Sequence, residues 1–256
     1  MCYLYSMNYM EQKKQGKAVG VILTYNCAHL VEGLIRRIPR DALDEIIIVD
    51  DSTRDQNETG AIAAKYDIPF FPQHCVGYGG NLKYGLRKAI ERGAAFAIEI
   101  HGDGQFDPSG IPLTVEKLRG GADFVMGSRF TNWKQPLRDG MPLIRFIANI
   151  MLSTIARTVL RIPWSEYHSG FRAYSGRLIN AVGNKGADNH IFSFQIIALA
   201  RFHNMKFDEI PIRANYRDEH TSVGLPEAAV YFFQVFIVLS QYVLARLGAK
   251  SDLFKE

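Results

Sequence analysis

Short apolar runs rich in β-branched residues alternate with longer helix-compatible segments through the first half of this 256-residue chain. The runs at 18–24, 45–50, 95–100 and 123–126 have the length of buried strands, and a shorter run lies at 68–71. Parallel strands need long crossover connections, which are usually helices. The alternation therefore predicts an α/β fold with a mainly parallel sheet and helices on both faces.

Polar or glycine-rich residues follow four of these predicted strands. In open parallel sheets, ligands bind beyond the carboxyl ends of the strands. We expect the four segments to border one crevice. They are Thr24-Tyr25-Asn26, Asp50-Asp51-Ser52-Thr53, His101-Gly102-Asp103-Gly104-Gln105 and Gly127-Ser128-Arg129.

Charge and cysteine content narrow the class of partner. Thirty basic and 26 acidic side chains give a formal net charge of +4, which suits a phosphate ligand or an acidic membrane surface better than a nucleic acid. The three cysteines form no Cys-x-x-Cys pair, so we expect a reducing compartment. Residues 1–17 lack the apolar run of a signal peptide, and we expect a flexible leader on a cytoplasmic protein.

The segment from His101 to Gln105 carries the sharpest local signal. Alternate residues of an extended chain point the same way, so His101, Asp103 and Gln105 are predicted to converge. A carboxylate with such neighbours suits Mg²⁺ or Mn²⁺, especially when diphosphate oxygens complete the shell. A polar turn before Pro108 is the alternative. Similarly, Asp50 and Asp51 are alternatively helix caps.

Several motifs, in this order along the chain, resemble those of family 2 glycosyltransferases with the GT-A fold. The similarity is greatest to the branch of dolichyl-phosphate mannose synthases and bacterial polyprenyl-phosphate glycosyltransferases, and it covers roughly residues 18–223. The motifs are Thr24-Tyr25-Asn26, Val49-Asp50-Asp51-Ser52-Thr53, Gly77-Tyr78-Gly79-Gly80-Asn81, Asp103-Gly104-Gln105, Gly127-Ser128-Arg129-Phe130, the segment from Glu166 to Tyr174 and Glu209-Ile210-Pro211-Ile212.

The resemblance implies a nucleotide-sugar donor, UDP- or GDP-linked, and a divalent metal. It implies metal ligands at Asp103 and Gln105, with His101 where the family usually has the first Asp of Asp-x-Asp, and a phosphate contact at Arg129. Because imidazole brings less charge than a carboxylate, we expect weaker Mg²⁺ binding or a preference for Mn²⁺. The expected donor-binding residues are Thr24, Tyr25, Asn26, Asp50, Asp51, Gly77, Gly79, Asn81, Arg172, Arg217 and His220.

The resemblance also implies direct displacement with inversion at the anomeric carbon. A lipid-phosphate acceptor is already an anion and needs no general base, whereas a hydroxyl acceptor does. Glu166 and His168 are the candidate bases, unless Glu166 only pairs with Arg172. We favour a polyprenyl phosphate acceptor. A sugar hydroxyl of a polysaccharide or glycolipid, and a non-catalytic nucleotide-sugar-binding subunit, are the alternatives.

Two later helices carry the remaining apolar sequence. The first is predicted at 141–161, with a polar stripe formed by Arg145, Asn149, Ser153, Arg157 and Arg161 that suits an acidic membrane or a lipid phosphate. The second is predicted at 226–247, and its residues 228–245 carry no charge. We favour peripheral membrane contact or subunit packing for it over spanning or core burial.

These features divide the chain into three parts. We expect a leader (1–17), a catalytic domain (18–223) and a C-terminal helix with its tail (224–256). The catalytic domain has a nucleotide-binding half (18–129) and an acceptor-side half (130–223).

Overall fold

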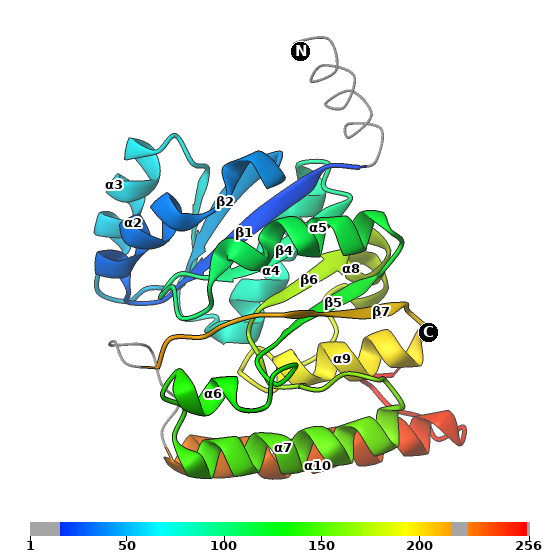
Figure 1. Ribbon diagram of the computed structural model, residues 1–256. Helices are drawn as coiled ribbons and strands as arrows, with labels where there is room; N and C mark the ends of the chain where they lie inside the picture. Colours follow the sequence, from blue (N-terminus) through cyan, green and yellow to red (C-terminus); the bar gives the residue numbers. More distant parts are fainter. Residues whose placement is uncertain (1–15, 217–224, 255–256) are drawn as a thin grey trace, which may run out of the picture.

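The computed structural model describes residues 16–216 and 225–254, and a seven-stranded sheet forms its centre (Figure 1). The strand order is β3-β2-β1-β4-β6-β5-β7, and only β6 runs antiparallel to its neighbours. The predicted mainly parallel sheet is confirmed. The strands are β1 (Ala18–Thr24), β2 (Glu45–Asp50), β3 (Phe70–Pro72), β4 (Phe96–His101), β5 (Phe124–Ser128), β6 (Arg172–Ser175) and β7 (Phe207–Pro211).

Helices cover both faces of the sheet, as a parallel sheet requires. On one face lie α2 (Ala28–Arg37), α3 (Gln56–Lys65) and α5 (Ile111–Arg119). On the other lie α4 (Gly77–Glu91), α8 (Gly176–Val182) and α9 (Phe192–Phe202). Successive residues of β1 serve the two cores alternately: Val19, Val21 and Leu23 face the second group, and Ala18 and Ile22 the first.

Pairing registers bring the polar strand ends level with one another. Thr24 at the end of β1 pairs with Asp50 of β2, and His101 of β4 pairs with Leu23. The Gly102 amide extends this pairing by donating to the Leu23 carbonyl at 2.8 Å. The expected convergence of these segments at one edge of the sheet therefore follows from the register.

Some element boundaries differ from the predicted ones. β3 begins at Phe70, two residues later than expected, and the glycine-rich segment expected as a turn forms the first turn of α4. The sequence did not predict β6 and β7, because β6 has four residues including Arg172, and β7 carries Asp208 and Glu209.

A further layer lies outside α9. It contains α7 (Leu143–Leu160) and α10 (Leu225–Arg246), which lie side by side and contact each other, and the short α6 (Gln135–Arg138) contacts α7 (Figure 1). The predicted polar stripe of α7 is divided: Ser153 is buried and its Oγ accepts the Tyr167 amide at 3.3 Å, whereas Arg157 is exposed. The first half of α7 exposes apolar side chains, with Ile144 70% exposed.

Candidate active site

The buried carboxylate of Asp50 joins the ends of β1 and β2. Its Oδ1 accepts hydrogen bonds from the hydroxyls of Thr24 at 2.5 Å and Ser52 at 2.6 Å. Its Oδ2 is buried and has no hydrogen-bond partner among the described residues. Thr24 and Asp50 therefore stabilise the strand ends that the donor was predicted to meet, and direct donor contact stays a prediction for both.

Asp51 fixes the start of α4. Its Oδ1 accepts the Val76 amide and its Oδ2 accepts the Gly77 amide, each at 2.9 Å. These amides belong to the first turn of a helix, where backbone N–H groups lack partners and negative charge is favourable. Asp51 is indeed a helix cap, but of α4 rather than of the helix that follows it in sequence. Its contact with a base or ribose stays a prediction.

Asn26 links the two loops that follow β1 and β2. It has a positive φ of 50°, and its Oδ1 accepts the amides of Thr53 at 3.0 Å and Arg54 at 3.1 Å. The neighbouring Tyr25 is 50% exposed. An exposed aromatic ring on a fixed loop offers a stacking surface for a planar base.

The glycines at the start of α4 allow a close approach, but the approach is to another segment of this chain. A Cβ on Gly77 would lie 2.5 Å from the Asp188 carbonyl oxygen, and one on Gly79 would lie 2.5 Å from that of Ala187. Asn81 is buried one turn later, where its Nδ2 donates to the Val49 carbonyl at 3.2 Å. These three residues therefore shape the start of α4 through packing. We call this segment, residues 77–81, the donor loop, and its contact with a donor stays a prediction.

The turn after β4 presents an oxygen-rich site. The partly exposed Asp103 carboxylate accepts the Gln105 amide through Oδ1 at 3.0 Å, and Gly104 has a φ of 65°. Arg37 donates to the Gly104 carbonyl at 3.1 Å and holds the turn against α2. Within the described ranges, no three His, Cys, Asp or Glu side chains are grouped to hold a metal. A cation here would depend on Asp103, Gln105 and oxygens of a bound ligand.

The His101 ring has Glu99 as its hydrogen-bond partner, and its place in a metal site stays a prediction. Its Nε2 lies 3.0 Å from Glu99 Oε1, and Tyr78 and Tyr174 donate to the two Glu99 oxygens at 2.5 Å each. Burial opposes ionisation of Glu99, but the hydrogen bond and positive charge of His101, together with Arg172 and Tyr174, outweigh it and hold the pKa of Glu99 below its usual value. Burial alone would lower the pKa of His101. The hydrogen bond and negative charge of Glu99 act in the opposite direction, and the pKa lies above its usual value.

Sequence reasoning missed Glu99, although one signal was available. A single carboxylate within the apolar run of β4 is costly to bury unless it has partners. His101 lies two residues along the same strand, but its other two partners, Tyr78 on α4 and Tyr174 on β6, come from positions that no local pattern connects to it.

Where the end of β5 meets the segment before β6, Arg129 and Glu166 form a buried ion pair. The Arg129 amide donates to Glu166 Oε2 at 2.7 Å, its Nε donates to Oε1 at 2.8 Å, and a third contact joins its Nη2 to Oε1. Another guanidinium nitrogen donates to the Tyr216 hydroxyl. Glu166 therefore pairs with Arg129 rather than with Arg172, and the guanidinium expected to contact phosphate already has protein partners.

His168 and Arg172 are two further residues of the predicted site. Burial, followed by the positive charges of Arg172 and Arg129, lowers the pKa of His168 to about 3. His168 Nδ1 lies 3.2 Å from the Tyr231 hydroxyl on α10, and its buried Nε2 has no hydrogen-bond partner within 16–216 and 225–254. Arg172 is buried and donates to the backbone carbonyls of Ser169, at 2.7 Å, and Ser193.

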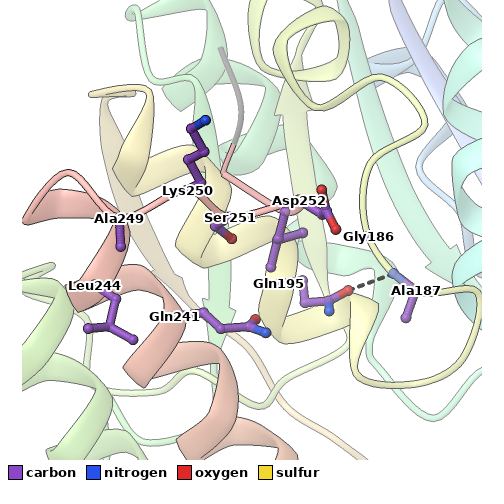
Figure 2. Close-up of a pocket in the computed structure, with 10 residues that line it drawn as sticks. Gly186, Ala187, Gln195, Gln241, Leu244, Ala249, Lys250, Ser251 and Asp252 are labelled. Atoms are coloured by element: carbon purple, nitrogen blue, oxygen red, sulfur yellow. Dashed lines mark hydrogen bonds between the residues drawn. The ribbon is translucent and has the colours of Figure 1, made fainter.

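Two expected donor contacts, Arg217 and His220, lie outside the described residues. A separate pocket of about 490 Å³ lies between α9, α10 and the C-terminal tail, where Gln195, Gln241 and Lys250 line it (Figure 2). None of the expected site residues lines this pocket. Its lining residue Ala187 donates its amide to Gln195, and the Ala187 carbonyl oxygen would lie 2.5 Å from a Cβ added to Gly79.

One family model and several known proteins match this chain. The family model described as Glycosyl transferase family 2 matches residues 21–183. The chain is 25% identical to a UDP-N-acetylglucosamine–dolichyl-phosphate N-acetylglucosaminyltransferase of Methanococcus voltae, over 80% of this chain and 88% of that protein. It is 27% identical to an undecaprenyl-phosphate mannosyltransferase of Micrococcus luteus, over 70% of this chain and 75% of that protein.

A similar fold occurs among solved structures. Glucosyl-3-phosphoglycerate synthase of Mycobacterium tuberculosis, in complex with Mn²⁺, UDP and glucosyl-3-phosphoglycerate, superposes with a TM-score of 0.66. The superposition covers 93% of this chain and 82% of that chain at 18% sequence identity. At 18% sequence identity, the superposition shows that the two proteins share a fold.

Proposed function

The chain belongs to glycosyl transferase family 2, and we propose that it transfers a sugar from a nucleotide-sugar donor to the phosphate of a polyprenyl phosphate. Family membership makes it a glycosyltransferase with the GT-A fold. The acceptor, the donor base and the membrane location are the proposed parts. As the resemblance implies, transfer proceeds with inversion at the anomeric carbon.

The surroundings of the two candidate bases, Glu166 and His168, are our reason for proposing a phosphate acceptor. Glu166 is fully buried against Arg129, which donates to both of its carboxylate oxygens. His168 has a pKa of about 3, far below the value at which a base works well near neutral pH. A hydroxyl acceptor needs a base to take its proton, and neither candidate is in a suitable state, whereas a phosphate acceptor needs no base. The site therefore favours a phosphate.

The donor end supports a nucleotide diphosphate bound with Mg²⁺ or Mn²⁺. Mg²⁺ is commonly held by one or two carboxylates together with substrate phosphates, and the partly exposed Asp103 carboxylate beside Gln105 fits that pattern. When bound, the cation stabilises the charge of the departing diphosphate. Asp103 and Gln105 hold its position, and Tyr25 offers its exposed ring to the base.

UDP-linked sugars are the first donors to test, with GDP-linked sugars as the alternative. UDP is named for the Methanococcus voltae relative and for the similar solved structure. The relatives' names also specify dolichyl phosphate and undecaprenyl phosphate as acceptors.

The outer helices supply a surface for a lipid acceptor. The 18-residue windows Leu143–Leu160 and Ala229–Arg246 are apolar and long enough to span a membrane, but they lie side by side on one flank of the molecule (Figure 1). Only 28% and 22% of these windows are buried. Helix α7 carries no acidic residue. An apolar surface of this extent suits peripheral contact with the cytoplasmic face of a membrane.

A transfer assay tests the acceptor. Purified protein with Mn²⁺ and radiolabelled UDP- or GDP-sugars should release nucleoside diphosphate and label a polyprenyl phosphate. The matched control is the corresponding polyprenol, which keeps the lipid and presents a hydroxyl in place of the phosphate. Equal labelling of both lipids, or labelling of a glycan hydroxyl only, would contradict the proposed acceptor.

Flotation with anionic liposomes tests the membrane surface. The wild-type protein should float, and an Ile147→Asp/Phe233→Asp double variant, which changes exposed residues of α7 and α10, should stay at the bottom. Leu113→Asp alters an exposed apolar residue on α5 and should float like the wild type. If the double variant instead changes a dimer into a monomer and floats unchanged, α7 and α10 form an interface between copies.

A further inference from the structure

Glu99 connects three parts of the active site through one buried carboxylate. It lies on β4 and is fully buried, and both of its oxygens have partners. Tyr78 comes from the donor loop at the start of α4, and Tyr174 comes from β6. The third partner, His101, ends β4 directly before the Asp103 turn.

The His101 ring is confined on several sides. Its Nε2 is 3.0 Å from Glu99 Oε1, and its ring centroid lies 5.4 Å from that of Phe106 and 5.9 Å from that of Tyr78. A Cβ added to Gly170 would lie 2.5 Å from His101 Cε1. The ring therefore occupies a closely packed position between the donor loop and the segment that leads into β6.

We infer that His101 is a positioning residue that Glu99 holds behind the Asp103 turn, and that its imidazole is not a ligand of the divalent metal. This inference rests on the proposed function, in which Asp103 meets the metal. It explains how the chain accommodates His where the family usually has Asp. The carboxylate that an Asp would bring is already present two residues earlier, at Glu99, but it points into the protein and binds tyrosines.

This arrangement changes what His101→Asp should do. Restoring Asp-x-Asp would place a second carboxylate beside buried Glu99 and remove the hydrogen-bond donor that Glu99 now has. Like charges in a buried site disfavour each other strongly. The substitution should therefore damage the site rather than improve metal binding, and neutralising Glu99 should relieve the damage.

A double-mutant cycle on the ligand-free protein tests the pair without requiring activity. We expect His101→Asp to lower the equilibrium constant for folding, and Glu99→Gln/His101→Asp to recover about tenfold or more of that loss, as coupled neighbours do. Urea unfolding measures all four proteins. Additive effects of the two substitutions would overturn the pairing of Glu99 with His101.

Pulsed EPR of Mn²⁺ bound to the full-length protein with UDP tests the absence of a metal–imidazole bond. We expect no coupling from a directly bound histidine nitrogen. His101→Ala should lower kcat about tenfold or more, as loss of a residue supporting metal ligands does, whereas His101→Gln, which keeps an N–H donor for Glu99, should retain most of it. A nitrogen coupling that disappears in His101→Gln would overturn the inference.

The two failures are distinguishable. Absence of any Mn²⁺–nucleotide binding by the wild-type protein would count against the proposed function, and the unfolding cycle would still decide whether Glu99 and His101 are coupled. Binding with a histidine nitrogen in the metal shell would leave the proposed function standing and refute the positioning role.

Discussion

The donor side and the acceptor side of this molecule satisfy their polar groups in different ways. At the ends of β1 and β2, the carboxylates of Asp50 and Asp51 bind hydroxyls and backbone amides of adjacent loops. On the acceptor side, Arg129 and Glu166 bind each other through a buried ion pair. The donor edge thus uses carboxylates that accept from neutral hydroxyls and amides, whereas the other region buries two opposite charges against each other.

The two sides also differ in what they expose. Next to the donor edge, Tyr25 is a single exposed ring, and single exposed apolar residues are ordinary on protein surfaces. On the acceptor side, α7 and α10 expose aliphatic and aromatic side chains along two adjacent helices. Under the proposed function, we expect a preformed donor edge and an acceptor side that a membrane lipid completes. The substitutions below test it.

The largest effect is expected from removing one charge of the buried pair. Glu166→Gln should lower the free energy of unfolding by about 3–5 kcal/mol, because Arg129 stays buried with no opposite charge. Urea denaturation measures the change. Glu91→Gln is the matched control, since it breaks the 2.7 Å Lys88–Glu91 pair on an exposed helix surface and should have no measurable effect. Equal changes in the two variants would show that the acceptor side does not depend on this pair.

The next effect is on activity rather than stability. Asp103→Asn should lower kcat/KM about a hundredfold or more, since the carboxylate proposed to hold the metal is lost. Stability should change little, because the Asn carbonyl can still accept the Gln105 amide.

Asp51→Asn is the structural counterpart at the donor edge. One end of its amide group would present N–H donors to the backbone amides of Val76 or Gly77, so it should lower the melting temperature. Thermal unfolding and steady-state kinetics on both variants separate the two roles. A destabilised Asp103→Asn protein with normal activity would contradict the assignment.

The sequence was sufficient for most of the central sheet. The runs at 18–24 and 45–50 coincide with β1 and β2, because strands buried on both faces are continuously apolar. β6 and β7 escaped prediction since each is short and contains charged residues whose partners lie on other elements. Local periodicity carries no information about such partners.

The site was predictable as a set of segments but not as a set of contacts. Motif order brought Arg129 and Glu166 into the same list of site residues, yet their mutual pairing depends on how β5 and the segment before β6 meet. The role of His101 depended in the same way on Glu99, which belongs to no recognised motif. Long-range pairing of charges is decided by tertiary structure, so sequence reasoning left the wrong partner, Arg172, open for Glu166.

A smaller effect should distinguish packed glycines from free ones. Gly79→Ala should destabilise the protein by about 1–3 kcal/mol, because the new methyl would lie 2.5 Å from the Ala187 carbonyl and 2.7 Å from Phe192 Cβ. Gly33→Ala, in α2 with nothing near its Cβ position, should stabilise by about 0.4–1 kcal/mol. Urea denaturation measures both. A neutral Gly79→Ala would mean that the donor loop is not held tightly against residues 187–189.

The smallest effect concerns His168 and pH. Its pKa of about 3 in the folded protein lies below the ordinary value of 6.5, so the unfolded chain binds one more proton between these limits. Its contribution to stability is therefore complete above pH 6.5 and decreases as the pH falls. At pH 5.5 the loss should be about 1 kcal/mol.

The pKa of His190 is also lowered, by burial first, and it adds a loss of the same sign. The difference between the wild type and His168→Gln therefore isolates the His168 contribution. Urea unfolding at pH 5.5 and 7.5 should show a shallower pH dependence in the variant. The same low pKa means that kcat/KM should show no ionisation of His168 near neutral pH. A pH-rate limb between pH 6 and 7 that vanishes in His168→Gln would restore His168 as a general base and, with it, a hydroxyl acceptor.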